Sequence, residues 1–483
     1  MTKNKYIYNI KKFCYNNEKI YKLEWIILSI VAFFAFFSYF YGDIILTTSH
    51  GFGVWESLFN GSISDYYYDM ENRLVNFYSG SCFSSAIYPF PLYIVFAIWN
   101  LPLYVIKCFW GIDPTTSRLL LAYAKSILIL FLLGSAMIIY KICKNIGIDN
   151  IKSKWCVFYF LSSSFVIFPL LIQSQYDIIS VFFTLLGLLY YIKNDQKKFV
   201  LFFALAITMK LFALFIFVPL VLLKEKKIFK ILFYSIAGIS ILVAQGIIFK
   251  KPESAEGCAN NMIGYIFSGK ICDASIFIIL LFCLCVYCYF KKESTKEFSI
   301  LVAFAGMGSF FLFSFAHPYW IILLCPYLSI LVFAFPEYIK INCILETILS
   351  LSCIFHYTLT IPHCFSINVI KPSLFSKFFG EPSAEYFAGA NKGLNFILEK
   401  LIGNETFFSF ANPTFFSIFV GAMICFFVVN YFAINKKENL KTNSIEKQQM
   451  LDVNIRTLIW TRFIINFGVG FSILALYIFF MLK

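Results

Sequence analysis

The sequence predicts an all-α polytopic membrane protein with about 13 transmembrane helices and with interfacial helices in the first external loop. Of the 483 residues, 60% are hydrophobic and only 14% are charged, a composition that excludes an ordinary soluble domain. The apolar residues form runs of about 20, the length that crosses a bilayer as a helix. Most lysines lie in short segments between these runs, as in cytoplasmic loops, so the net charge of +14 does not indicate nucleic-acid binding.

The charge pattern divides the chain into three parts. Residues 1–22 form a basic cytoplasmic tail. Residues 23–335 form the main transmembrane module, in which the first run crosses outward at 23–41 and opens a first external loop at 42–116. Residues 336–483 form a C-terminal transmembrane region with an external loop at 361–413 and a cytoplasmic loop at 435–462. The C-terminus is then expected outside.

The remaining crossings follow from the alternation of basic and less basic ends. The run 87–110 contains Pro89, Pro91 and Pro102 and would break this alternation if it crossed, so we interpret it as interfacial or re-entrant. The expected crossings after it are 117–140, 155–171, 178–192, 231–249, 275–290, 299–316, 321–335, 343–360, 414–434 and 463–482.

The apolar run 199–223 is basic at both ends, with Lys197 and Lys198 before it and Lys224 after it. Basic ends mark the cytoplasmic side, so this run is expected to start and finish there. About 25 residues are enough for two short helices that go in and back, which places Lys210 near the turn. An ionisable residue within such a segment is a functional-site hypothesis.

Five polar residues then fall on the external side, namely Asp43, His50, Asp177, Lys210 and His317. Asp43 directly follows the first crossing, where partial desolvation suits a general base. Histidines and a lysine supply the donors and positive charge that bind a phosphate. The pattern therefore indicates group transfer from a phosphorylated lipid.

The stretch Gly42-Asp43-x6-His50-x4-Trp55 resembles the first external loop of the integral-membrane type C glycosyltransferases. Members of that superfamily use an acidic residue of this loop as catalytic base, a role that the resemblance gives to Asp43. The protein mannosyltransferases have a paired Asp-Glu here, whereas Ile44 follows Asp43, which counts against a protein acceptor.

Other segments are similar to the same superfamily, and together they cover roughly two thirds of the chain. Gln175-Tyr-Asp177 looks like one of its turns, and residues 204–220 with Lys210 look like its short central hairpin. His317-Pro-Tyr-Trp320 is similar to its late external motif, which meets the lipid phosphate.

The resemblance implies a catalytic module at 23–335 that moves a monosaccharide, with inversion, from a polyprenyl-phosphate donor to a hydroxyl of a glycan or glycolipid. The donor phosphate would contact Lys210, His317, Lys125 and Arg118. The acceptor or supporting residues would be His50, Trp55, Asp177 and Gln175. No cofactor is firmly expected, and a divalent metal shared by Asp43 and Asp177 stays an open alternative. A nucleotide-sugar site is not expected, because no Gly-rich phosphate loop is present.

These expectations describe a multi-pass integral membrane protein, of the plasma membrane if bacterial, with a cytoplasmic N-terminus and an extracytoplasmic active site. One alternative is a transporter or flippase of a lipid-linked or charged solute, which also needs ionisable residues and broken helices near a cavity. Another is an O-antigen polymerase or ligase, which normally depends on external arginines, of which Arg73 is the clearest here.

Overall fold

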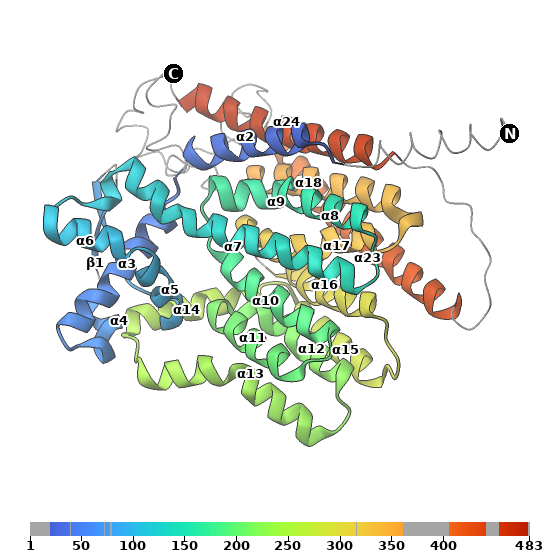
Figure 1. Ribbon diagram of the computed structural model, residues 1–483, viewed down its shortest axis with the longest axis horizontal. Helices are drawn as coiled ribbons and strands as arrows, with labels where there is room; N and C mark the ends of the chain where they lie inside the picture. The colour runs from blue at the N-terminus through green and yellow to red at the C-terminus, as the bar shows by residue number, and fades with distance from the viewer. Residues whose placement is uncertain are drawn as a thin grey trace.

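The structure is a computed structural model that describes residues 20–38, 40–71, 73–77, 80–314, 316–360, 405–440 and 454–481. The described part is almost entirely helical (Figure 1). Residues 361–404, most of the expected external loop at 361–413, and residues 441–453, the middle of the expected cytoplasmic loop, lie outside the described residues.

The elements follow one another in three groups. The first group is α2 Lys22–Ser38, α3 Gly42–Phe59, η1 Ile63–Asp65, α4 Tyr66–Asp69, β1 Arg73–Phe77, β2 Gly80–Ser84, α5 Phe90–Trp99, α6 Leu101–Trp110 and η2 Pro114–Thr116. The second is α7 Arg118–Asn145, α8 Asn150–Leu161, α9 Ser164–Val166, the π-helix η3 Ile167–Ile172, α10 Asp177–Ile192, α11 Gln196–Met209, η4 Leu211–Ala213, α12 Leu214–Lys224 and α13 Ile228–Ile248. The third is α14 Glu253–Gly264, η5 Tyr265–Phe267, β3 Lys270–Ile271, β4 Ala274–Ser275, α15 Ile276–Phe290, α16 Lys296–Phe313, η6 Pro318–Leu323, α17 Cys325–Ala334, η7 Pro336–Tyr338, α18 Ile339–Thr360, α23 Glu405–Leu440 and α24 Ile455–Met481.

The prediction of an all-α membrane protein is confirmed at this coarse level. Among the described residues, 5 helices are long and apolar enough to cross a bilayer, or up to 8 if each of three bent helix pairs is one span. The 5 are Arg118–Asn145, Ile228–Ile248, Lys296–Phe313, Pro336–His356 and Pro413–Glu438. Four further apolar helices are shorter, so the expected number of crossings is not confirmed.

The first external loop is more structured than the sequence suggested. Interfacial helices were expected there, and α3 is one helix of 18 residues whose axis is bent by 69° from that of α2. An antiparallel hairpin follows, with Arg73 opposite Ser84. Helices α5 and α6 have 10 residues each and meet at 65° at Asn100. Each is about 15 Å long, half the thickness of a bilayer core, as an interfacial or re-entrant segment requires.

The helical hairpin around Lys210 is confirmed. Helix α11 ends at Met209, Lys210 itself is extended (φ −154°, ψ 120°), and α12 returns after one short 3₁₀ turn. The rings of Phe203 and Phe217 lie 5.3 Å apart across the hairpin. At its open end, Gln196 Nε2 donates to Glu225 Oε1 at 2.5 Å. The chain therefore goes in and comes back, as the basic residues at both ends predicted.

The segments predicted to share a side also lie together. Two hydrogen bonds and three ion pairs join the predicted cytoplasmic ends. The hydrogen bonds run from Lys296 Nζ to Asn145 O and from Lys226 Nζ to Cys288 O. The ion pairs are Lys291–Glu438, Lys437–Glu297 and Lys436–Glu337. At the other end, Lys251 Nζ donates to Ile87 O at 2.6 Å, and Ser254 Oγ donates to Glu71 Oε1 at 2.7 Å. These contacts bring the predicted ends together in two groups, whereas the number of crossings and the side that each group faces stay predictions.

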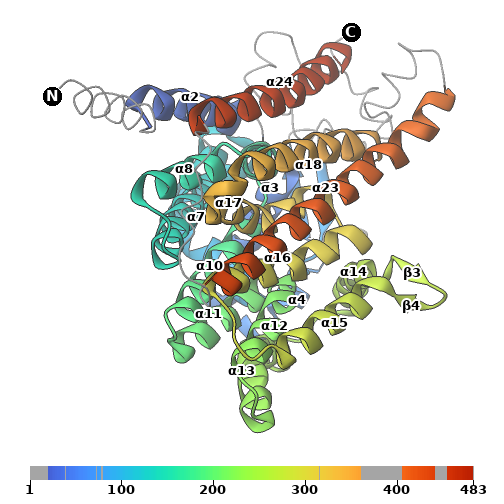
Figure 2. The same ribbon diagram turned by 90° about the vertical axis from the view of Figure 1, so that its right-hand side faces the viewer.

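Helix α24 packs beside α2, and α23 packs beside α18, in both views (Figure 2). Helical structure extends into both ends of the expected cytoplasmic loop at 435–462, because α23 continues to Leu440 and α24 begins at Ile455. The expected external loop at 361–413 is also helical from Glu405 onward. The largest fully buried side chains of the described residues include Trp155, Trp320 and Arg462.

Candidate functional site

Asp43 lies in the first turn of α3, where the helix dipole stabilises a carboxylate. Its side chain is half-buried. Gln175 Nε2 donates a hydrogen bond to Asp43 Oδ2 at 2.8 Å and so joins two segments 132 residues apart. Asp43 is therefore held in one orientation at the start of its helix, as a positioned general base must be.

The segment from Gln173 to Asp177 comes directly after the π-helix η3 and leads into α10. Ser174 has a positive φ of 53°, an uncommon conformation for a residue other than glycine that often marks a functional site. We expected this segment to be an external turn, but Gln175 and Asp177 are only 2% and 1% exposed. The segment is instead enclosed by the protein, which makes its polar groups costly unless they are paired.

Lys210 pairs with Asp177 inside this enclosed region. The distance from Lys210 Nζ to Asp177 Oδ1 is 2.9 Å, and the two side chains are 8% and 0% exposed. Rings surround the ammonium group, with centroids at 4.8 Å for Trp320, 5.3 Å for Tyr88, 5.6 Å for Phe212 and 5.8 Å for Tyr176. These faces stabilise the cation further by cation–π attraction.

Asp43 lies within electrostatic range of both Lys210 and Asp177. Tyr88, Tyr176 and Tyr319 are in the same electrostatic neighbourhood. The site thus contains two carboxylates and one ammonium. The resemblance implied that Lys210 contacts the donor phosphate, and the structure shows its ammonium group paired with Asp177.

His317 joins the same group through Trp320. The imidazole stacks on Tyr319, with the ring centroids 5.2 Å apart and an angle of 4° between the ring planes. It meets Trp320 in a T-shaped arrangement, with the ring centroids 4.7 Å apart and an angle of 81°. Because the Trp320 ring also contacts the Lys210 ammonium group, it forms a shared wall between the two. The structure therefore brings together Asp43, Gln175, Asp177, Lys210 and His317, five of the residues predicted from the sequence.

His50 and Trp55 lie further along α3, against a second hydrophobic cluster that includes Tyr66, Tyr93 and Ala97. The His50 ring meets Tyr93 edge-on at 5.5 Å, and Trp55 Nε1 donates to Ala97 O at 2.9 Å. These contacts pack α3 on α5. A role in acceptor binding is untested.

Lys125 has a supporting position. It is fully buried in α7, and Nζ donates to the backbone carbonyls of Phe36 at 2.9 Å and of Leu171 at 2.5 Å. It thus ties the end of α2 to the π-helix η3, and these contacts explain its burial without a phosphate. Arg118 is the first residue of α7, about two turns before Lys125, and is half-buried.

Sequence reasoning missed two sets of residues. Tyr88 and Tyr176 line the site, and the position of Tyr176 between Gln175 and Asp177 was the available signal. Glu346 and Arg462 form a second buried ion pair, outside the site. An acidic residue inside the expected crossing at 343–360 was the signal for that pair.

Among the residues that the structure describes, no group of three or more His, Cys, Asp or Glu side chains is arranged to hold a metal ion. Sharing of a metal by Asp43 and Asp177 stays untested. No protein-family model matches the chain, and no curated protein matches it either. The interpretation of this site therefore rests on its own residues and geometry.

Proposed function

We propose that the protein is a membrane glycosyltransferase that moves a monosaccharide from a polyprenyl-phosphate donor to a hydroxyl of a glycan or glycolipid acceptor. The observation that carries this proposal is the half-buried Asp43 carboxylate, oriented by Gln175 and within electrostatic range of the enclosed Lys210–Asp177 pair. A base and a cation within one site suit a displacement that deprotonates one reactant and releases a phosphate from the other.

In the proposed reaction, the acceptor oxygen attacks the anomeric carbon as the bond from that carbon to the phosphate oxygen breaks. The configuration at the anomeric carbon inverts. The acceptor proton passes to Asp43, whose Oδ2 is fixed by Gln175, and we assign Oδ1 to the proton. The electron pair of the broken bond leaves with the polyprenyl phosphate, which Lys210 and His317 receive.

The Lys210–Asp177 pair has a defined part in this scheme. Asp177 holds the Lys210 ammonium group in place in an enclosed environment before the donor arrives. The donor phosphate then competes with Asp177 for the ammonium group, while the rings of Tyr88, Tyr176 and Trp320 remain as walls against which a sugar ring packs. Lys125 supports the frame by its backbone contacts.

The decisive experiment incubates the purified protein with a panel of radiolabelled polyprenyl-phosphate sugars and glycolipid acceptors. Asp43→Asn should lower the rate by roughly 100-fold to 10,000-fold, the usual contribution of a general base. Asp65→Asn is the matched control, because Asp65 is an exposed acidic residue of the same region and should leave the rate unchanged. Full activity of Asp43→Asn would remove Asp43 as the base.

We also propose the topology of about 13 crossings, with the N-terminus inside and the C-terminus and site outside. The gathering of Lys226, Lys291, Lys296, Lys436 and Lys437 at one end favours the cytoplasm for that end, since basic residues mark the cytoplasmic side. Asn60 and Lys197 are both exposed and lie at opposite ends in this topology. A membrane-impermeant thiol reagent added outside should label Asn60→Cys and not Lys197→Cys, and the reverse pattern would overturn the orientation.

A transporter of a charged solute is the second candidate, favoured by the buried Lys210–Asp177 pair at the turn of a broken helical segment. It predicts solute movement across proteoliposomes that depends on Asp177, without turnover of any sugar donor. A polymerase or ligase that uses external arginines is less favoured, since Arg73 is engaged by Glu56 at 2.6 Å and by Ser49 at 2.9 Å.

A further inference from the structure

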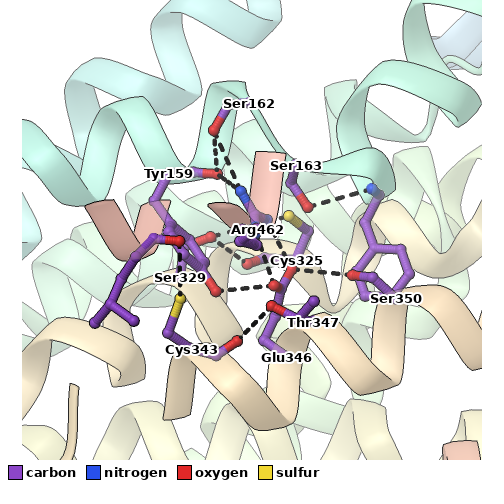
Figure 3. Close-up of polar contacts among 12 residues, drawn as sticks. Tyr159, Ser162, Ser163, Cys325, Ser329, Cys343, Glu346, Thr347, Ser350 and Arg462 are labelled. Atoms are coloured by element: carbon purple, nitrogen blue, oxygen red, sulfur yellow. Dashed lines mark hydrogen bonds and ion pairs between the residues drawn. The ribbon is translucent and has the colours of Figure 1, made fainter. Parts of the chain in front are cut away.

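Helix α24 carries a buried arginine that forms a two-point ion pair with α18 (Figure 3). Arg462 Nε donates to Glu346 Oε2 at 2.8 Å, and Nη2 donates to Oε1 at 2.7 Å. Both residues are 1% exposed. Tyr159 Oη and Ser350 Oγ also donate to the carboxylate, at 2.8 Å and 3.1 Å, so Glu346 is fully engaged.

The same arginine holds the end of α8. Arg462 Nη1 donates to Tyr159 O at 3.1 Å and to Ser162 Oγ at 3.2 Å, and the guanidinium lies 3.8 Å from the Tyr159 ring. A cation at the C-terminal end of a helix satisfies its last carbonyls and complements its dipole. Arg462 therefore fixes the point at which the chain leaves α8 toward the candidate site.

A second contact lies between α8 and the site. A Cβ atom on Gly470 of α24 would lie 2.2 Å from the ring of Phe168, so a larger residue at this position would require that ring to move. Phe471 also packs on Phe168, at 5.8 Å. Phe168 belongs to the π-helix η3, which leads directly to Gln175. Helix α24 thus contacts the chain that leads to Gln175 at two places, first at the end of α8 and then at Phe168.

Helix α24 also holds the other arm of the site. Arg456 Nε and Trp460 Nε1 donate to Glu24 Oε1 at 2.7 Å and 3.2 Å, which binds α24 to α2 (Figure 2). Helix α2 leads directly to Asp43. Helix α24 therefore contacts both α2, which precedes Asp43, and η3, which precedes Gln175, the two residues joined by a hydrogen bond.

We infer that the packing of α24 sets the position of Asp43 relative to Gln175, and that Arg462 and Glu346 are positioning residues for the candidate site. The C-terminal helix then belongs functionally to the catalytic module that the sequence placed at 23–335. The geometric part of this inference stands on the contacts above, and only its effect on turnover rests on the proposed function.

The geometric part is tested by cross-linking in the full chain. Asp43→Cys and Gln175→Cys are combined with a protease site at Gly147, an exposed glycine between α7 and α8 with no atom within 4 Å of its Cβ position. A short bifunctional thiol reagent then joins the two fragments after cleavage. The two single-cysteine parents show the background from the native cysteines.

Arg462→Met should slow cross-linking at least about tenfold, the effect of a displaced contact on an intramolecular reaction. Because this variant leaves Glu346 as an unpaired buried charge and can fail to fold, Arg462→Met with Glu346→Leu is the second variant. It removes both charges and keeps the interior apolar, yet should also slow cross-linking. Arg462→Lys should restore the rate in part, since lysine keeps the charge without the two-point geometry.

The matched control replaces another buried polar pair of α18, Asn342 with Asn430, by two leucines. This pair joins α18 to α23 and should leave the cross-linking rate unchanged. If the double variant at Arg462 and Glu346 cross-links like the parent, α24 does not set the site and the inference fails. In an active preparation, the same variant should lower kcat with an unchanged KM for the donor. If cross-linking is slowed but no glycosyl transfer is found, the proposed function is rejected and the positioning role of α24 is retained.

Discussion

Replacing Lys210 by methionine should destabilise the protein more than replacing its partner Asp177 by asparagine. The Lys210→Met variant leaves the fully buried Asp177 without its cation, and Asp43 within electrostatic range loses the same cation. Breaking a buried pair in this way costs about 3–5 kcal/mol of the free energy of unfolding. In Asp177→Asn, Lys210 keeps Asp43 and the surrounding rings, so the expected loss is only about 1–3 kcal/mol.

The measurement is unfolding by a denaturing detergent in mixed micelles, followed by tryptophan fluorescence. The double variant Lys210→Met with Asp177→Leu removes both charges and should recover most of the stability, since an apolar replacement of a buried pair is often neutral. The coupling free energy, which is the sum of the two single losses minus the loss in the double variant, should therefore be at least about 2 kcal/mol. Equal losses in the two single variants, or a double variant equal to their sum, would refute the proposed interaction of Lys210 with both carboxylates.

Three further predictions follow from particular contacts. Gln175→Leu should lower turnover about tenfold to 100-fold while the free energy of unfolding falls by only about 1 kcal/mol, because one hydrogen bond to Asp43 is lost; an unchanged rate would show that the orientation of Asp43 does not matter. Gly306→Ala should cost about 1–3 kcal/mol, since its Cβ would lie 2.4 Å from the carbonyl oxygen of Phe215, whereas Gly421→Ala, on an exposed helix face with nothing within 4 Å, should be neutral or stabilising in the same unfolding assay. Asn342→Leu should cost about 1–3 kcal/mol because it leaves Asn430 Oδ1 buried without its donor, while Asn430 Nδ2 keeps its hydrogen bond to Phe426 O, and the double replacement by leucines should regain most of that loss; strictly additive losses would contradict the reciprocal pairing.

The charge pattern predicted the order of the helices along the chain and the end of the bundle at which particular residues lie. The hairpin around Lys210 followed from basic residues at both of its ends, and the contact between Gln196 and Glu225 confirms that these ends meet. The assignment of Asp43, Asp177, Lys210 and His317 to one side followed from the same alternation. These four residues do gather, because the ends of antiparallel helices on one side of a bundle are neighbours in space.

Side-chain partners could not be predicted in the same way. Lys125 is of a residue type that binds phosphate, yet its buried position in α7 places Nζ against two backbone carbonyls. Arg462 lay within an expected polar loop, because the sequence does not show that α24 begins at Ile455. The pairing of Arg462 with Glu346 depends on how α24 packs on α18, which hydropathy does not encode.

The π-helix Ile167–Ile172 has a consequence for sequence variation in this region. A π-helical turn contains one residue more than an α-helical turn, so it behaves as a single-residue insertion kept in the chain. Deleting one residue there would let the turn close as an α-helix and would rotate everything after it by about 100°. Gln175 would then point away from Asp43, even though every side chain of the site was still present. The spacing between Ser163 and Gln175 is thus as much a part of the site as its residues, and natural variants should change side chains in this stretch more readily than its length.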